Sequence, residues 1–145
     1  MTKQQLKEYC EAEFENIDIV LSEFYTVINT EKSGYSVSEL AALATFIHNF
    51  YNGIENTLKR ILLFKQIEIK NTSTWHKDLL KNSSDIGIIT EELYITLSNY
   101  LSFRHFFVHS YSFSLTWQEL RPLAESVEST LKIFRSLINQ YIEDS

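Results

Sequence analysis

The stretch SVSELAALATFIHNFYNGIENTLKRILL, residues 36–63, decides the fold class of this chain. Ser36 and Glu39 have the S-x-x-E spacing of a capping box, in which each side chain accepts a hydrogen bond from the other residue's backbone N–H. The sequence therefore predicts a helix of about eight turns that begins at Ser36 and ends near residues 67–71. The residues on its apolar face recur at steps of one, three and four, and they are Leu40, Leu43, Ala44, Ile47, Phe50, Tyr51, Ile54, Leu58, Ile61 and Leu62.

The same periodicity continues on both sides of this stretch. Residues 3–29 place apolar side chains at steps of three and four, and Thr90, followed by two glutamates, marks the start of a further long helix. Two starts are open for the last helix: Thr116, which has capping-box spacing with Glu119, and Pro122, which suits a first helical turn. The sequence thus predicts five helices. The first covers residues 3–29, the second begins at 36 and ends near 67–71, and the third, a short one, covers 75–81; the fourth begins at 90, and the last begins at 116 or 122 and ends at about 141.

The composition supports a helical chain that forms one domain. Only 3 Gly and 1 Pro occur in 145 residues, whereas an average composition has roughly 12% of the two together. Because β-hairpins and βα crossovers use Gly and Pro at their turns, a chain with so few of both has few turns and long secondary-structure elements. Cys10 is the only cysteine, so we expect a buried structural thiol and no internal disulfide. We expect an all-α fold, an antiparallel up-and-down four-helix bundle with a short connecting helix, as a single domain over residues 1–145.

The charge of the chain is uneven. The net charge is −6 and the pI is about 5.2, which argues against a protein that coats nucleic acid but does not exclude a local basic site. Acidic side chains predominate in residues 1–23, whereas basic ones cluster in the middle third, between Lys59 and Lys81. No apolar run approaches the roughly 20 residues of a membrane span, and no leader segment is evident. We therefore expect a cytoplasmic protein without membrane contact.

Arg104 interrupts the apolar stripe of the third long helix. The stripe passes through Leu97 and Leu101, and its next step lands on Arg104. A guanidinium keeps its charge, so on a buried face it must be paired, face a cavity or meet a partner subunit. Two interpretations are open. Arg104 pairs with a carboxylate such as Glu55 while its stem covers the core, or it belongs to a functional site.

The string RHFFVHSY, which begins at Arg104, favours a functional site. It contains the pattern R-x4-H-x-Y, formed by Arg104, His109 and Tyr111. This pattern at the end of a helix resembles the signature of the HEPN (higher eukaryote and prokaryote nucleotide-binding) superfamily, in particular of its HepT-like toxins. The stretches FYNGIENTLKRI (50–61) and WHKDLL (75–80) are similar to the second helix and the short connecting helix of that family. The first and last helices match only in character.

The resemblance implies a toxin that is a metal-independent endoribonuclease, acts on tRNA or other RNA, and needs no cofactor. Its active site would form where two protomers of a homodimer meet. The residue types suit this chemistry, because RNA cleavage without a metal needs a base for the ribose 2′-OH, an acid for the leaving 5′-oxygen, and positive charge for the phosphorane. His109 can act as base or acid near neutral pH. Arg104 offers several donors to phosphate oxygens and stays charged.

The resemblance also implies a protein partner and a modification. The partner is an MNT-type nucleotidyltransferase antitoxin, which transfers AMP to Tyr111. An added nucleotide near Arg104 and His109 would occupy the place of the substrate phosphate. The alternative for Tyr111 is a ring buried at a helix end with its hydroxyl in water. Two other functions stay open for the chain: a HEPN module without cleavage, as a nucleotide-binding or scaffold subunit of a transferase complex, and a plain helical dimerisation module.

Two groups of polar residues could support the site. His48, Asn52, Glu55 and Lys59 form a polar stripe at steps of three and four. This stripe is either a solvated flank, or Asn52 and Glu55 reach the motif segment and orient Arg104. His105, one turn before His109, is a further supporting residue. The two histidines could chelate a metal, but two ligands do not make a site and no matching carboxylate or cysteine is evident, so we expect no metal.

Aromatic residues suggest two further features. Phe103, Phe106 and Phe107 surround Arg104 and leave more apolar surface than one bundle obviously covers, which favours a homodimer. Trp75 and His76 either stack on a nucleotide or anchor the short helix to the core.

Overall fold

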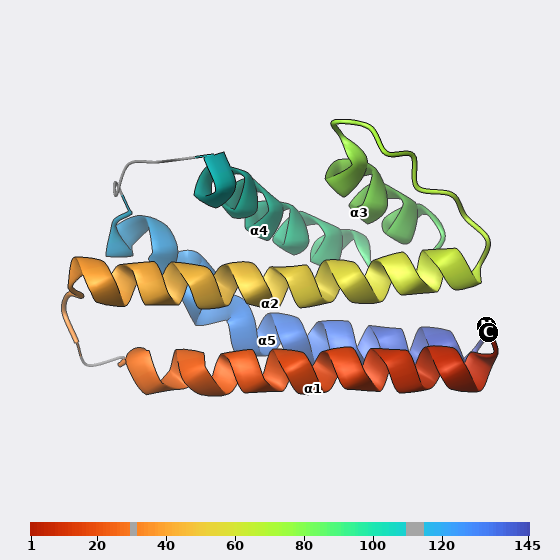
Figure 1. The fold of residues 1–145 in the computed structure, drawn as a ribbon, viewed down its shortest axis with the longest axis horizontal. Helices are drawn as coiled ribbons and strands as arrows, with labels where there is room; N and C mark the ends of the chain where they lie inside the picture. The colour runs from red at the N-terminus through yellow and green to blue at the C-terminus, as the bar shows by residue number, and fades with distance from the viewer. Residues whose placement is uncertain (30–31, 110–114) are drawn as a thin grey trace.

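The computed structural model describes residues 1–29, 32–109 and 115–145, and these residues form five α-helices and no strand (Figure 1). The four long helices alternate in direction along the molecule, which confirms an all-α bundle with a short additional helix. The helices are α1 (Lys3–Val27), α2 (Val37–Phe64), α3 (Trp75–Asp85), α4 (Glu91–His109) and α5 (Trp117–Glu143).

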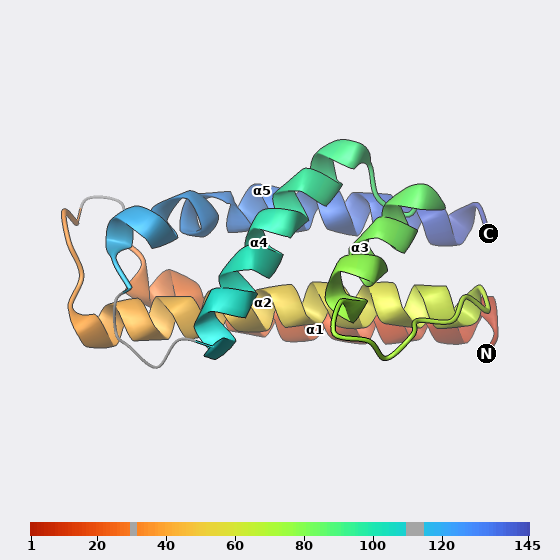
Figure 2. The same ribbon diagram turned by 90° about the horizontal axis from the view of Figure 1, so that it is seen from above.

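Three of the helices form the long body of the molecule. α1, α2 and α5 run along its longest axis, whereas α4 crosses α2 and α5 obliquely and α3 lies beside α4 (Figure 2). α1 packs on α2 and α5, and it lies on the side of α2 away from α3 and α4. The two chain ends meet at one end of the body, where Lys3 Nζ donates to the Glu143 carbonyl at 3.0 Å.

The capping residues set where the helices begin. Ser36 and Glu39 form both bonds of the predicted capping box, at 3.1 and 2.8 Å. Thr90 Oγ1 accepts from the Leu93 backbone N–H at 3.1 Å, so α4 begins as predicted. Thr116 Oγ1 accepts from the Glu119 backbone N–H at 3.2 Å, which decides between the two starts of the last helix. Pro122 lies inside α5.

Two predicted helix ends were wrong. α2 stops at Phe64 rather than near residues 67–71, because Gln66 adopts a left-handed backbone with φ of 60°. α3 continues past Lys81 to Asp85, through residues that resemble a loop in sequence. The buried residues of α3 are Leu79, Leu80 and Ser83, and the Ser83 hydroxyl is satisfied inside the helix because it donates to the Leu79 carbonyl at 2.8 Å.

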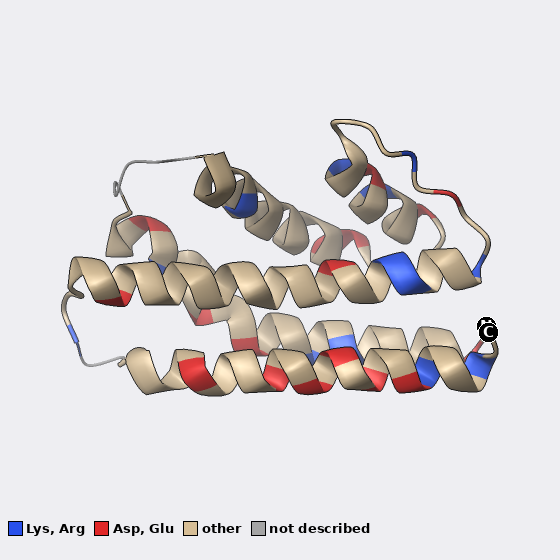
Figure 3. Cartoon of the chain, in the orientation of Figure 1, with Lys and Arg blue, Asp and Glu red and all other residues tan. Residues whose placement is uncertain are grey.

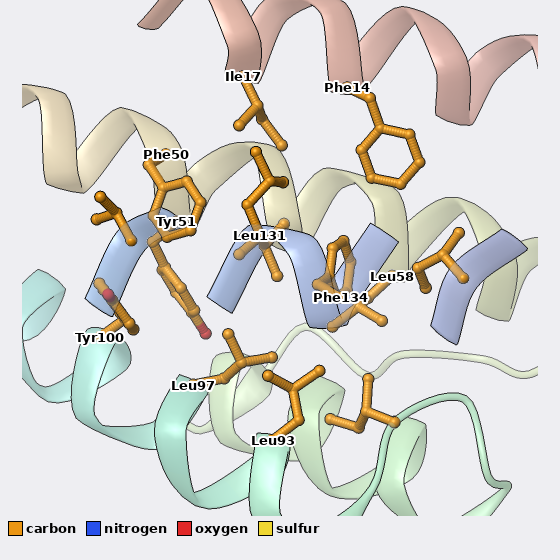
Figure 4. Close-up of a cluster of buried hydrophobic side chains, with 14 of the residues drawn as sticks. Phe14, Ile17, Phe50, Tyr51, Leu58, Leu93, Leu97, Tyr100, Leu131 and Phe134 are labelled. Atoms are coloured by element: carbon orange, nitrogen blue, oxygen red, sulfur yellow. The ribbon is translucent and has the colours of Figure 1, made fainter. Parts of the chain in front are cut away.

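The core joins α1, α2, α4 and α5 (Figure 4). Its largest fully buried side chains include Phe14, Phe50, Tyr51 and Tyr100. Gly53 lets α1 approach α2 closely, since a Cβ atom there would lie 2.5 Å from Cγ1 of Ile17. The core is thus tightly packed between α1 and α2.

Two further properties follow from the described residues. Cys10 is buried among the apolar side chains, and burial raises the pKa of its thiol to about 12, so the thiol stays protonated at neutral pH. Within the described ranges, no helix is both long enough and apolar enough to cross a membrane.

Candidate functional site

The last turns of α4 carry the motif residues. Arg104 is partly buried and its Nε atom is fully enclosed, with no hydrogen-bond partner among the described residues. His105 and His109 are exposed, and the centroids of their rings lie 4.6 Å apart. Tyr111 lies outside the described residues. This end of α4 therefore presents an arginine that carries an unsatisfied donor and two accessible imidazoles.

α2 meets this part of α4 through His48. The His48 ring packs against the ring of Phe107 at 5.0 Å, and Asn52 Nδ2 lies 3.1 Å from His48 Nε2. Burial, and then the positive charge of Arg104, lower the pKa of His48, although Glu55 opposes the shift. His48 is therefore neutral at neutral pH, and the described hydrogen bond of Asn52 goes to His48 and not to Arg104.

Glu55 is a buried carboxylate with a different partner from the one considered in sequence. It is 3% exposed. His76 Nδ1 lies 2.8 Å from its Oε2 atom and 3.0 Å from its Oε1 atom. Within the described part of the chain, no hydrogen bond joins Glu55 to Arg104. Burial, and then the charge of Glu55, raise the pKa of the neighbouring Tyr51, whereas the charge of Arg104 opposes this shift. Arg104 and Glu55 therefore both influence the pKa values of His48 and Tyr51, although the described structure shows no hydrogen bond between them.

Trp75 and His76 connect α3 to α2. Their rings stack with centroids 3.6 Å apart, and Lys59 Nζ lies 4.2 Å from the centroid of the Trp75 ring. Trp75 also packs against the core, as an anchoring role requires. Sequence reasoning missed the pairing of Glu55 with His76. The available signal was the position of Glu55 on the apolar face of α2, because a carboxylate there needs a partner.

A groove of about 610 Å³ lies between α3 and α4 and reaches Arg104. His76 and Lys77 line it from α3, and His105 lines it from α4. The remaining lining residues are Ser73, Thr74, Leu80, Tyr94, Ser98, Leu101 and Ser102. We call this hollow the α3–α4 groove. Among the described residues, no cluster of three or more His, Cys, Asp or Glu side chains occurs that could hold a metal ion.

The α2–α5 region of this structure corresponds to a known family. A family model described as HepT-like protein matches residues 42–145. The chain belongs to the HepT-like family. The match includes almost all of α2 and the whole of α3, α4 and α5, so the HepT-like region contains every candidate site residue, whereas α1 lies outside it. The chain matched neither a curated protein nor a solved structure.

Proposed function

We propose that this HepT-like protein is a toxin that cleaves RNA, tRNA in particular, without a metal, and that Arg104 and His109 are its catalytic residues. The observation that carries the proposal is the end of α4, where a partly buried arginine precedes an exposed histidine by five residues and its Nε has no hydrogen-bond partner among residues 1–29, 32–109 and 115–145. A structural arginine at this depth would be expected to have a carboxylate partner. With respect to the described residues, Arg104 instead keeps the Nε donor for a ligand.

The proposed reaction is an internal transfer within the RNA strand. One imidazole takes the proton of the ribose 2′-OH, and the 2′-oxygen bonds to phosphorus. The bond from phosphorus to the 5′-oxygen breaks, and a second imidazole gives this oxygen its proton. Arg104 donates to the nonbridging oxygens, on which negative charge increases in the transition state. The products are a 2′,3′-cyclic phosphate and a free 5′-hydroxyl.

A homodimer would provide the second imidazole, because each protomer would bring one His109 to a shared site. Apolar surface at this end of α4 supports the arrangement. Val108 is 46% exposed next to His109, and Phe106 is only partly buried. His105 would assist in the same shared site. Asn52 and Glu55 would support the site indirectly. Asn52 would hold the imidazole of His48, and Glu55 would hold that of His76.

The proposed antitoxin is an MNT-type nucleotidyltransferase that works in the cytoplasm. It would transfer AMP from ATP to the Tyr111 hydroxyl, releasing pyrophosphate. The adenylate would bring a negative phosphodiester within two residues of His109, where it would compete with the substrate phosphate. The support for this step is family membership and the position of Tyr111 in the sequence.

Purified protein tests the proposal with tRNA as substrate in the presence of EDTA. We expect His109→Ala to lower the cleavage rate by about 100-fold or more, because general acid–base catalysis commonly contributes that much. Arg104→Ala should lower it as well, and Arg121→Ala serves as a matched control, since Arg121 is exposed on α5 and pairs with Glu125. Melting curves check that each variant is folded. An unchanged rate in His109→Ala would refute its assignment, and intact tRNA with wild-type protein would favour the non-catalytic alternative.

A further inference from the structure

The α3–α4 groove differs in charge from the rest of this acidic protein. Its described lining contains Lys77, Arg104 and two histidines, but no Asp or Glu. Two other surface hollows, at α1 and α5, both include Glu128, and a third, between α4 and α5, has no charged residue in its described lining. The acidic residues are dense along α1, on the other side of α2 (Figure 3). A groove without carboxylates in a chain of 19 acidic residues is suited to an anion.

The imidazole of His76 is fixed in this groove by its neighbours. Nδ1 is hydrogen-bonded to the buried Glu55, and the ring stacks on Trp75. Among the described residues, the second ring nitrogen, Nε2, has no hydrogen bond, and little side-chain freedom of His76 remains to be lost on binding. A second carboxylate, Asp78, contacts the lining from outside, where it accepts from Thr74 Oγ1 at 3.2 Å. Glu55 and Asp78 are thus each engaged by a side chain that lines the groove.

Apolar side chains complete the groove. Leu80 is buried, and Tyr94 and Leu101 are partly buried between the two polar sides. A nucleotide has matching chemistry, with an anionic phosphate and a base whose faces pack on apolar and aromatic groups. Since Arg104 belongs both to the groove and to the candidate catalytic site, a strand bound at Arg104 would place its neighbouring nucleotide here.

We propose that the α3–α4 groove binds a phosphate of the RNA strand next to the cleaved bond, through Lys77 and His76 of α3 and His105 of α4. This inference rests on the proposed nuclease function, to which it adds a binding subsite away from the motif. Lys77 contributes a mobile positive charge. The imidazolium form of His76 contributes a preoriented hydrogen bond, because Nδ1 donates to Glu55 and Nε2 donates to a phosphate only when it carries a proton as well.

Binding is measured separately from cleavage. The parent is the His109→Ala protein, and the probe is a short fluorescein-labelled single-stranded RNA, followed by fluorescence anisotropy over a range of NaCl concentrations. We expect Lys77→Glu to weaken binding about tenfold or more and to lower the salt slope by about one, because one phosphate contact is lost. Lys132→Glu is the matched control. It makes the same change of charge at an exposed position on α5, and it should alter the dissociation constant less than about threefold.

Each outcome decides the inference. A loss of RNA affinity in Lys77→Glu but not in Lys132→Glu supports RNA binding in the groove. A further loss of affinity in His76→Ala supports the role of the His76 imidazole. Equal losses of RNA affinity in the two lysine variants would show that only the net charge of the protein matters, and they would overturn the inference that the groove binds RNA. AMP that binds as tightly as the RNA, with the same dependence on Lys77, would make the ligand a mononucleotide and overturn the RNA assignment. tRNA cleavage by wild-type protein tests the proposed function independently, so cleavage without selective binding rejects the groove alone.

Discussion

Replacing Gly53 by alanine tests how closely α1 and α2 are packed. An added Cβ would lie 2.5 Å from Cγ1 and 2.8 Å from Cδ1 of Ile17, a side chain that is only 1% exposed. In an open helical position, Gly→Ala stabilises by up to about 1 kcal/mol. Overpacking a tight core costs about 1–3 kcal/mol. We therefore expect Gly53→Ala to destabilise the protein by about 1 kcal/mol net, which lowers Tm by about 2–4 °C for a chain of this size.

Urea unfolding followed by circular dichroism measures this effect, and a second substitution identifies its cause. Ile17→Ala removes both contacting atoms and by itself costs about 2–5 kcal/mol. When it is made in the Gly53→Ala protein, the Ile17→Ala substitution should lower the free energy of unfolding by about 1 kcal/mol less than in the wild type, or by a smaller amount still, because it relieves the close contact. Gly34→Ala is the control: a Cβ there has no atom within 4 Å, so its stability should not fall. Additive effects at positions 17 and 53, or a more stable Gly53→Ala protein, would refute the packing argument.

Two further predictions concern the polar residues under α4. A double-mutant cycle on Glu55 and His76 should give a coupling energy of about 2 kcal/mol in urea unfolding, against less than about 1 kcal/mol for the exposed pair of Asp18 and Arg135; equal couplings would contradict the buried pairing. His48 has a lowered pKa in the folded protein. Below about pH 6.5 the unfolded chain therefore binds a proton at this residue more readily than the folded chain does, and the free energy of unfolding decreases as the pH decreases. His48→Phe should make the unfolding midpoint less sensitive to pH between 7.5 and 5.5, and an unchanged dependence would reject this assignment.

Local signals in the sequence predicted much of the fold. The capping box at Ser36 is a property of four consecutive residues, so its prediction was confirmed. The start of α5 stayed open because Thr116 and Pro122 both carry valid local signals, and only the hydrogen bond to Glu119 decides between them. The extension of α3 was missed because Ser83 looks like a loop residue, although its hydroxyl is satisfied inside the helix.

The candidate site depends on contacts between distant parts of the sequence. Periodicity singled out Arg104 as a charge on an apolar stripe, and the structure places it partly buried, with no hydrogen bond from Nε to any residue that it describes. The partner of Glu55 could not be predicted in the same way, because His76 is 21 residues away and on another helix. The roles of His109 and Tyr111 stay predictions, since a shared site would depend on a second chain or a modifying enzyme.

The buried thiol of Cys10 makes this protein convenient for site-directed labelling. It is 1% exposed, and its pKa is raised to about 12, so a maleimide meets neither an accessible sulfur nor a thiolate in the folded chain. A cysteine introduced at Ser102, which is exposed beside the α3–α4 groove, would then be the reactive thiol, and the unsubstituted protein would serve as the blank. A dye at this position would report binding of the proposed ligand through its emission, and spin labels on two copies would report the distance between the protomers of the proposed homodimer.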